Sequence, residues 1–151
     1  MIRLKHHKLT GAFFLIALGL VVAACGDDTP MEEEQEPQVA TMRLTVGAQT
    51  VDVAEDGTVT GGPISIPVGM TAVSVEFLLA SGQPEPLVTA AEFQANVASD
   101  DETTVTFTRT SAFAGMLDGV ASGSAVLSFS LFHIEEAHED FGPFPVSTTV
   151  Q

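Results

Sequence analysis

Short alternating runs of apolar and polar residues dominate the chain from about Ala40 onward. Met42, Leu44 and Val46 alternate with polar residues, which is the period of a strand that buries one face. The same alternation recurs at Val51 and Val53, at Ile64, Ile66 and Val68, at Val73, Val75, Phe77 and Leu79, at Val105 and Phe107, and at Leu127, Phe129 and Leu131. Glu55-Asp56-Gly57 predicts a tight hairpin turn. Half-buried runs of this kind are typical of antiparallel sheet and argue against a parallel α/β core.

Two parts of the pattern are less regular. Thr89-Ala90-Ala91-Glu92 has the spacing of a helix capping box. This region is therefore either a short helical turn or a strand or irregular crossover that includes Leu87, Phe93 and Val97. Val146–Val150 predicts a final edge strand. Together the runs predict an all-β fold, a single antiparallel β-sandwich of about seven or eight strands over residues 40–151, large enough to fold without a disulfide or a metal.

A different pattern occupies the first 24 residues. Three basic residues precede an apolar stretch from Ala12 to Val22, which is the arrangement of an export signal. The stretch is well short of the roughly 20 residues that cross a bilayer as a helix. Val22-Ala23-Ala24-Cys25 then resembles the lipobox of bacterial lipoproteins, which implies a signal peptide at 1–24, cleavage before Cys25 and a lipid on its sulfur. Lipidation also explains a lone cysteine in an exported chain; the alternative is an ordinary secretory signal that leaves Cys25 as a free thiol.

Residues 25–39 carry many carboxylates, two prolines and no apolar periodicity, which predicts a disordered acidic linker between the lipid and the domain. In Gram-negative lipoproteins an aspartate directly after the lipidated cysteine favours retention in the inner membrane. Gly26 stands in that place. The resemblance therefore implies an outer-membrane protein, facing either the periplasm or the surface, that contacts the bilayer through its lipid.

Charge narrows the range of partners. Cleavage before Cys25 would leave Arg43 and Arg109 against 20 acidic residues, a formal net charge of 2 − 20 = −18. Nucleic acid is excluded as a partner because its affinity comes from phosphate neutralisation by Lys and Arg. Such a surface attracts cations, although excess acid also serves solubility alone.

One stretch carries a second resemblance. Residues 113–129 read Phe-Ala-Gly-Met-Leu-Asp-Gly-Val-Ala-Ser-Gly-Ser-Ala-Val-Leu-Ser-Phe. The spacing of Gly115, Leu117, Gly119, Gly123 and Ala125 resembles the late part of bacterial Ig-like domains of the kind found in surface adhesins. That resemblance implies an Ig-like sandwich with a structural or interaction role. It covers this stretch well and Val146–Val150 loosely.

The segment 132–145 holds both histidines that follow Cys25, His133 and His138. Imidazole and carboxylate groups together suit zinc or copper. In a helix the two histidines would lie about 140° apart, and in a straight strand they would face opposite sides. Only a bend after Glu135 brings His133, Glu135 and His138 together.

Three further carboxylates, Glu136, Glu139 and Asp140, are additional candidate ligands in that segment. The alternative is that His133 caps the core at a strand end while 135–140 forms a solvated loop pinned by Phe141 and Phe144. Calcium on carboxylates alone, including Asp100-Asp101-Glu102, has no EF-hand spacing to support it.

Motifs of catalysis are missing from the sequence. It contains no G-x-S-x-G, no H-E-x-x-H and no phosphate-binding glycine loop, and it has no Trp or Tyr to form a sugar platform. We therefore expect no enzymatic activity. The sequence predicts a lipid-anchored, non-catalytic structural or interaction module with a protein partner, and as the alternative a zinc- or copper-binding lipoprotein.

Overall fold

The computed structural model of the chain describes residues 35–151, which form ten strands and no helix. The strands are β1 (Thr41–Val46), β2 (Gln49–Ala54), β3 (Val59–Thr60), β4 (Ile64–Ile66), β5 (Gly69–Leu78), β6 (Phe93–Ser99), β7 (Val105–Ser111), β8 (Ala114–Gly119), β9 (Gly123–His133) and β10 (His138–Val150). Over these described residues no helix is long and apolar enough to cross a membrane. The expected signal peptide 1–24, its Val22-Ala23-Ala24-Cys25 motif and most of the linker lie outside the described residues.

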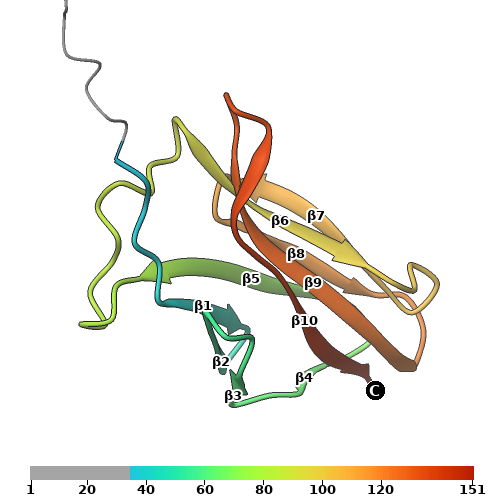
Figure 1. The fold of residues 1–151 in the computed structure, drawn as a ribbon. Coiled ribbons are helices and arrows are strands. Elements are labelled where there is room, and N and C mark those ends of the chain that lie inside the picture. The colour runs from blue at the N-terminus through green and yellow to red at the C-terminus, as the bar shows by residue number, and fades with distance from the viewer. Residues whose placement is uncertain (1–34) are drawn as a thin grey trace, which may run out of the picture. The chain divides into compact units, whose positions relative to one another are not determined.

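The strands form two sheets that share one core (Figure 1). The larger sheet has the order β3-β2-β1-β5-β8-β7 and is antiparallel throughout. The smaller sheet has the order β4-β10-β9-β6. Its β4–β10 pair is parallel and the other pairs are antiparallel. The predicted all-β, two-sheet architecture is confirmed, with ten strands in place of seven or eight.

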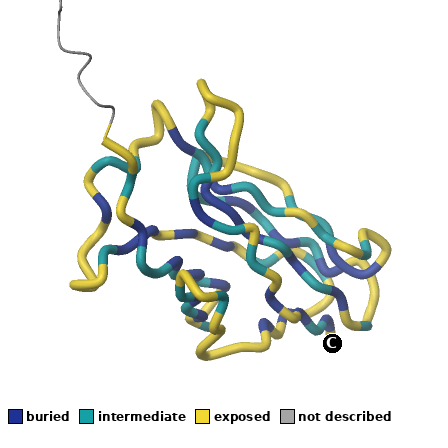
Figure 2. The backbone as a smooth tube through the Cα atoms, in the orientation of Figure 1, coloured by how far each residue is buried: buried dark blue, intermediate teal, exposed yellow. Residues whose placement is uncertain are grey.

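Alternation along the strands explains the core. In β1 the side chains of Met42, Leu44 and Val46 are buried, and in β9 those of Leu127, Phe129 and Leu131 are buried on the inner face of the other sheet. All belong to a single hydrophobic cluster. Buried positions therefore follow the strands while the loops are exposed (Figure 2). Removing these apolar groups from water is the main force that holds the sheets together.

The chain changes sheets between β3 and β4. Gly61 has φ 81°, and a Cβ on it would lie 2.5 Å from the carbonyl oxygen of Thr50, so the position needs glycine. The Gln49 side chain spans the crossing, because its Nε2 donates to the carbonyls of Gly61 and Pro63 at 3.0 and 2.6 Å. Its Oε1 also accepts the Ser65 N–H at 3.0 Å. The Gly61-Gly62-Pro63 break thus transfers the chain to the smaller sheet.

The expectation that Val146–Val150 forms an edge strand is wrong. These residues belong to β10, which pairs with β9 on one side and with β4 on the other. Two residues that the alternation predicted to face the core, Val68 and Leu79, are placed differently in the structure. Val68 is 54% exposed because β4 ends at Ile66, and Leu79 follows the end of β5, where Leu78 is buried in its place.

The irregular region between β5 and β6 combines both alternatives. Thr89 to Glu92 makes one turn, closed by a hydrogen bond from the Phe93 N–H to the Thr89 carbonyl at 2.9 Å. Thr89 Oγ1 donates to the Glu92 carboxylate at 3.3 Å. The chain then enters β6 at Phe93 without forming a helix. This turn places Glu92 and Phe93 beside the tip of the β9–β10 hairpin.

Residues 38–39 pack on the domain just before β1. Val39 is 9% exposed, and the Gln38 N–H donates to the carboxylate of Glu85 at 3.0 Å. That carboxylate is buried and also accepts the Leu87 N–H at 3.1 Å. Glu85 therefore fastens residues 38–39 and the 85–92 loop to each other.

Candidate metal centre

The candidate site is at the turn of the β9–β10 hairpin. Residues 134–137 form a tight turn in which Ala137 has φ 56° and donates its N–H to the His133 carbonyl at 3.0 Å. A left-handed conformation is costly for alanine. The turn sets His133 directly opposite His138 in the hairpin register. The bend that the sequence required for a shared site is therefore present around Glu135.

Three side chains gather at this turn. Glu136 Oε2 lies 3.6 Å from His133 Nδ1 and 3.3 Å from His138 Nδ1. One ligand atom from each of the three residues lies within 4.8 Å of the other two. Four ligands around zinc at about 2.0–2.1 Å would be about 3.3 Å apart at the corners of a tetrahedron. Two of the three separations are thus already close to those of a filled site.

Glu136, rather than Glu135, supplies the carboxylate that faces the imidazoles. Glu135 lies in the same turn and lines the adjoining cavity, but it is not in the three-residue group. Glu139 is exposed and pairs with Phe132 in the hairpin register. The choice between neighbouring glutamates depends on where the turn places each side chain, which the spacing of the residues does not reveal.

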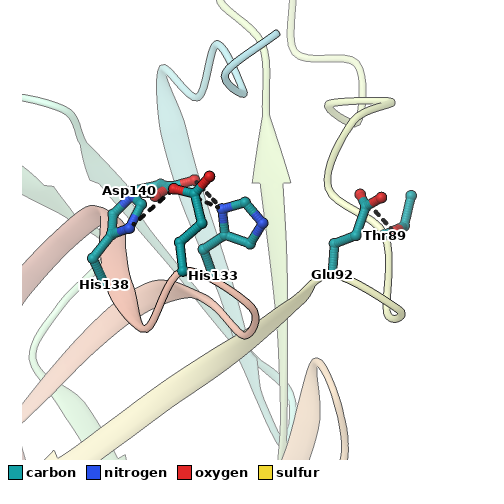
Figure 3. Close-up of polar contacts among 6 residues, drawn as sticks. Thr89, Glu92, His133, His138 and Asp140 are labelled. Carbon is teal, nitrogen blue, oxygen red and sulfur yellow. Dashed lines mark hydrogen bonds and ion pairs between the residues drawn. The ribbon is translucent and has the colours of Figure 1, made fainter. Parts of the chain in front are cut away.

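Asp140 is the least exposed carboxylate of the cluster, with 10% of its side chain accessible. Its Oδ2 lies 3.8 Å from His133 Nδ1, and its Oδ1 lies 2.5 Å from His138 Nε2. Figure 3 shows Asp140 between the two histidines. Among residues 35–151 Oδ1 has no hydrogen-bond partner, and its close contact is the ion pair with His138 Nε2. A buried carboxylate oxygen without a partner is costly, and a cation on the cluster would relieve that cost.

The two histidines are held differently. The His133 ring packs on the Phe93 ring at a centroid distance of 4.5 Å and an interplanar angle of 31°, and only 13% of its side chain is accessible. The His138 side chain is 50% accessible. Farther along the hairpin, the buried Phe141 contacts Phe144 edge to face at 4.9 Å. The sequence also allowed His133 to cap the core at a strand end, with the loop pinned by Phe141 and Phe144. These contacts anchor the candidate site.

A cavity of about 250 Å³ adjoins the cluster. Three segments line it: residues 35–37, residues 87–93 and the hairpin residues 133–140. The carboxylates of Glu36, Glu92 and Glu135 join those of Glu136 and Asp140 in its wall, and no lining residue in the described part of the chain is Lys or Arg. Like charges gathered without a counter-charge favour a bound cation.

Other acidic groups have structural explanations. The Asp101 carboxylate accepts hydrogen bonds from Thr103 and Thr104, which lower its pKa. Asp100 accepts the Val126 N–H at 2.7 Å. The Asp100-Asp101-Glu102 loop thus uses two of its carboxylates to fix its own conformation.

On the larger sheet, Arg43 pairs with Asp52 at 2.8 and 2.9 Å, and this hydrogen-bonded contact lowers the pKa of Asp52. The pair lies directly across β1 and β2 in the sheet register. Arg109 Nη2 donates to the Ala95 carbonyl at 2.9 Å and to Asn96 Oδ1 at 2.7 Å. Both arginines that follow Cys25 therefore have structural partners in the sheets.

A scan against models of known protein families found no match to this chain, and a search of curated proteins found no match either. Functional inference therefore depends on the hairpin geometry and on the sequence patterns.

Proposed function

We propose that this protein is an exported bacterial lipoprotein whose β-sandwich binds one divalent transition-metal ion, zinc or copper, at the β9–β10 hairpin. The observation that carries the proposal is the convergence of His133, Glu136 and His138, whose ligand atoms lie within 4.8 Å of one another. Two imidazoles and a carboxylate form a ligand set that suits zinc or copper. Asp140, whose side chain is 10% accessible and which contacts both imidazoles, adds a second negative charge beside the candidate ligands.

Metal binding is testable through thermal stability. The full chain carrying Cys25→Ser, which removes the thiol as a competing ligand, is melted with and without zinc or copper. At 100 times the Kd, a bound ion adds about 2.7 kcal/mol of stability, which raises the Tm of a domain of this size by roughly 10 °C. The shift should vanish in His133→Ala/His138→Ala and persist in His6→Ala/His7→Ala, the matched pair in the leader. Equal shifts in both pairs of variants would place the ion elsewhere.

The Ig-like assignment is part of the same proposal. In Ig domains of the constant type, strands A, B, E and D form one sheet and C, F and G form the other. The neighbours β1-β5-β8-β7 and β6-β9-β10 have these orders when β5 is strand B and β10 is strand G. Close packing at Gly115 and Gly119 gives a steric reason for two of the glycines in the stretch 113–129. The β2–β3 strands are then an addition at the outer edge of the larger sheet.

Lipid attachment at Cys25 is supported by the Val22-Ala23-Ala24-Cys25 motif, and Gly26 favours sorting to the outer membrane. Mass spectrometry of the protein from its native host should find an acylated Cys25 at the amino terminus of the processed chain. Fractionation of the cells should recover it with outer membranes. An unmodified thiol in the soluble fraction would exclude the anchor.

A non-catalytic interaction role is favoured by a different surface. Val68, Met70 and Val120 are 54%, 62% and 49% exposed. Gly69 pairs with Gly119 and Met70 with Asp118, which brings the three apolar side chains to the outer face at one end of β5 and β8. Exposed apolar patches of this type mark contact sites for protein partners. Capture of a native partner that fails with Met70→Glu would support this role.

A further inference from the structure

We propose that an ion bound by His133, Glu136 and His138 keeps one coordination position open toward the adjoining cavity, and that this position accepts a neutral nitrogen donor such as an imidazole or an amine. The inference rests on the proposed metal site and specifies what that site binds in addition to the ion. Sites with three protein ligands and an open position exchange external ligands, whereas structural zinc sites are closed by four protein ligands.

The first step is the count of protein ligands. Only three residues of the described chain converge on one point. Asp140 Oδ1 stands at Nε2 of His138, while Glu136 faces Nδ1 of the same ring. The two ring nitrogens point to different sides, so Asp140 Oδ1 contacts His138 on the side away from Glu136. Asp140 Oδ2 lies 3.8 Å from His133 Nδ1, but Asp140 is not in the group whose ligand atoms all lie within 4.8 Å of one another. A carboxylate on the second nitrogen of a metal-binding histidine fixes the ring orientation and tautomer, which leaves the fourth position without a protein ligand.

The second step is the space next to the cluster. The cavity of about 250 Å³ is far larger than the roughly 30 Å³ that one water occupies in the liquid. Glu92 does not fill it, because its carboxylate is held by Thr89 on the far side of the gap, as Figure 3 shows. Leu87 and Phe93 contribute apolar surface to the wall. The cavity therefore has both the volume and an apolar side for a small flat ring.

The third step is charge. The cavity wall carries Glu36, Glu92 and Glu135 in addition to the cluster itself, with no Lys or Arg among its described lining residues. An anionic ligand would approach several like charges at short range, where their repulsion is strongest. A neutral donor does not meet that repulsion. The open position therefore favours nitrogen donors such as imidazole over anions such as azide.

The test uses the full chain carrying Cys25→Ser, loaded with Co²⁺ as a spectroscopic substitute for zinc. Imidazole, the tripeptide Gly-His-Gly and azide are titrated separately while the visible Co²⁺ absorption is recorded. We expect a saturable spectral change with imidazole and at least tenfold weaker binding of azide. A response to the tripeptide would identify a protein histidine as an acceptable source of the donor, and a response to free imidazole alone would restrict the donor to small molecules.

A matched variant isolates the effect of charge. In Glu92→Gln, which removes one carboxylate from the wall without touching a ligand, the preference for imidazole over azide should fall several-fold. The same preference in wild type and variant would overturn the charge argument, and a Co²⁺ complex that ignores imidazole would show a closed site. A chain that does not bind Co²⁺ at all would instead contradict the proposed function.

Discussion

Gly119 provides a sharp test of the packing between the sheets. A Cβ on Gly119 would lie 2.5 Å from the Pro67 carbonyl oxygen and 2.8 Å from Val150 Cγ1. A backbone oxygen cannot rotate away, so Gly119→Ala must displace the 67–68 segment or β8. Overpacking of this kind costs about 1–3 kcal/mol, and the lower entropy of the unfolded alanine chain returns only about 0.4–1 kcal/mol. We expect a net loss of about 1–2 kcal/mol.

Gly123 is the matched control, because it belongs to the same stretch, 113–129. The three atoms nearest to a Cβ there all belong to the Thr104 side chain, at 3.2, 3.3 and 3.9 Å, so Gly123→Ala should change stability by less than about 1 kcal/mol. Urea unfolding of both variants measures the difference. At an m-value of about 1–3 kcal/mol per molar urea, Gly119→Ala should lower the midpoint by about 0.5–1.5 M. If Gly119→Ala and Gly123→Ala lower the free energy of unfolding by amounts that agree within about 0.5 kcal/mol, the steric explanation of the glycine spacing in this stretch is refuted.

Three further predictions concern the hairpin and the acidic loops. Glu136→Gln should weaken zinc binding at least tenfold in calorimetry while Glu139→Gln changes it less than twofold; equal effects would remove Glu136 from the ligand set. Asp140→Asn should weaken zinc about 10- to 100-fold with the Co²⁺ spectrum unchanged, whereas an altered spectrum would make Asp140 a ligand. The hydrogen bonds from its threonines lower the pKa of Asp101. Its stabilising contribution is therefore present above the pKa of the unfolded chain, about 3.9, and is lost as the pH falls through the lower pKa of the folded state. Wild type should therefore lose more stability than Asp101→Asn between pH 5 and pH 2 in urea unfolding, and parallel pH profiles would contradict this.

The sequence predicted the strands well where one face is buried. The alternation at Met42, Leu44 and Val46 and at Leu127, Phe129 and Leu131 maps directly onto the core, because a period of two follows from strand geometry. Pairing between distant segments was not predictable in the same way. The parallel contact of Ile64–Ile66 with 148–150 joins residues more than 80 positions apart, and no local pattern records it.

The sequence predicted where the candidate site lies but not which carboxylates belong to it. His133 and His138 mark the hairpin because nitrogen ligands are rare in this chain. The identity of the carboxylate depends on the conformation of the turn, and the left-handed position there is taken by Ala137, where a glycine or asparagine would have signalled it. The burial of Asp140 arises from tertiary packing, so no signal in the sequence distinguishes it from its acidic neighbours.

The placement of β10 has a consequence for the order of folding. Because β10 lies between β4 and β9, the smaller sheet has no continuous ladder until residues 138–150 have been synthesised. A nascent chain that ends before them would leave β4 without its neighbour and the inner face of β9 partly open. The larger sheet contains no segment beyond Gly119 and can pair earlier. The smaller sheet is therefore completed only when its inner strand β10 joins β4 to β9.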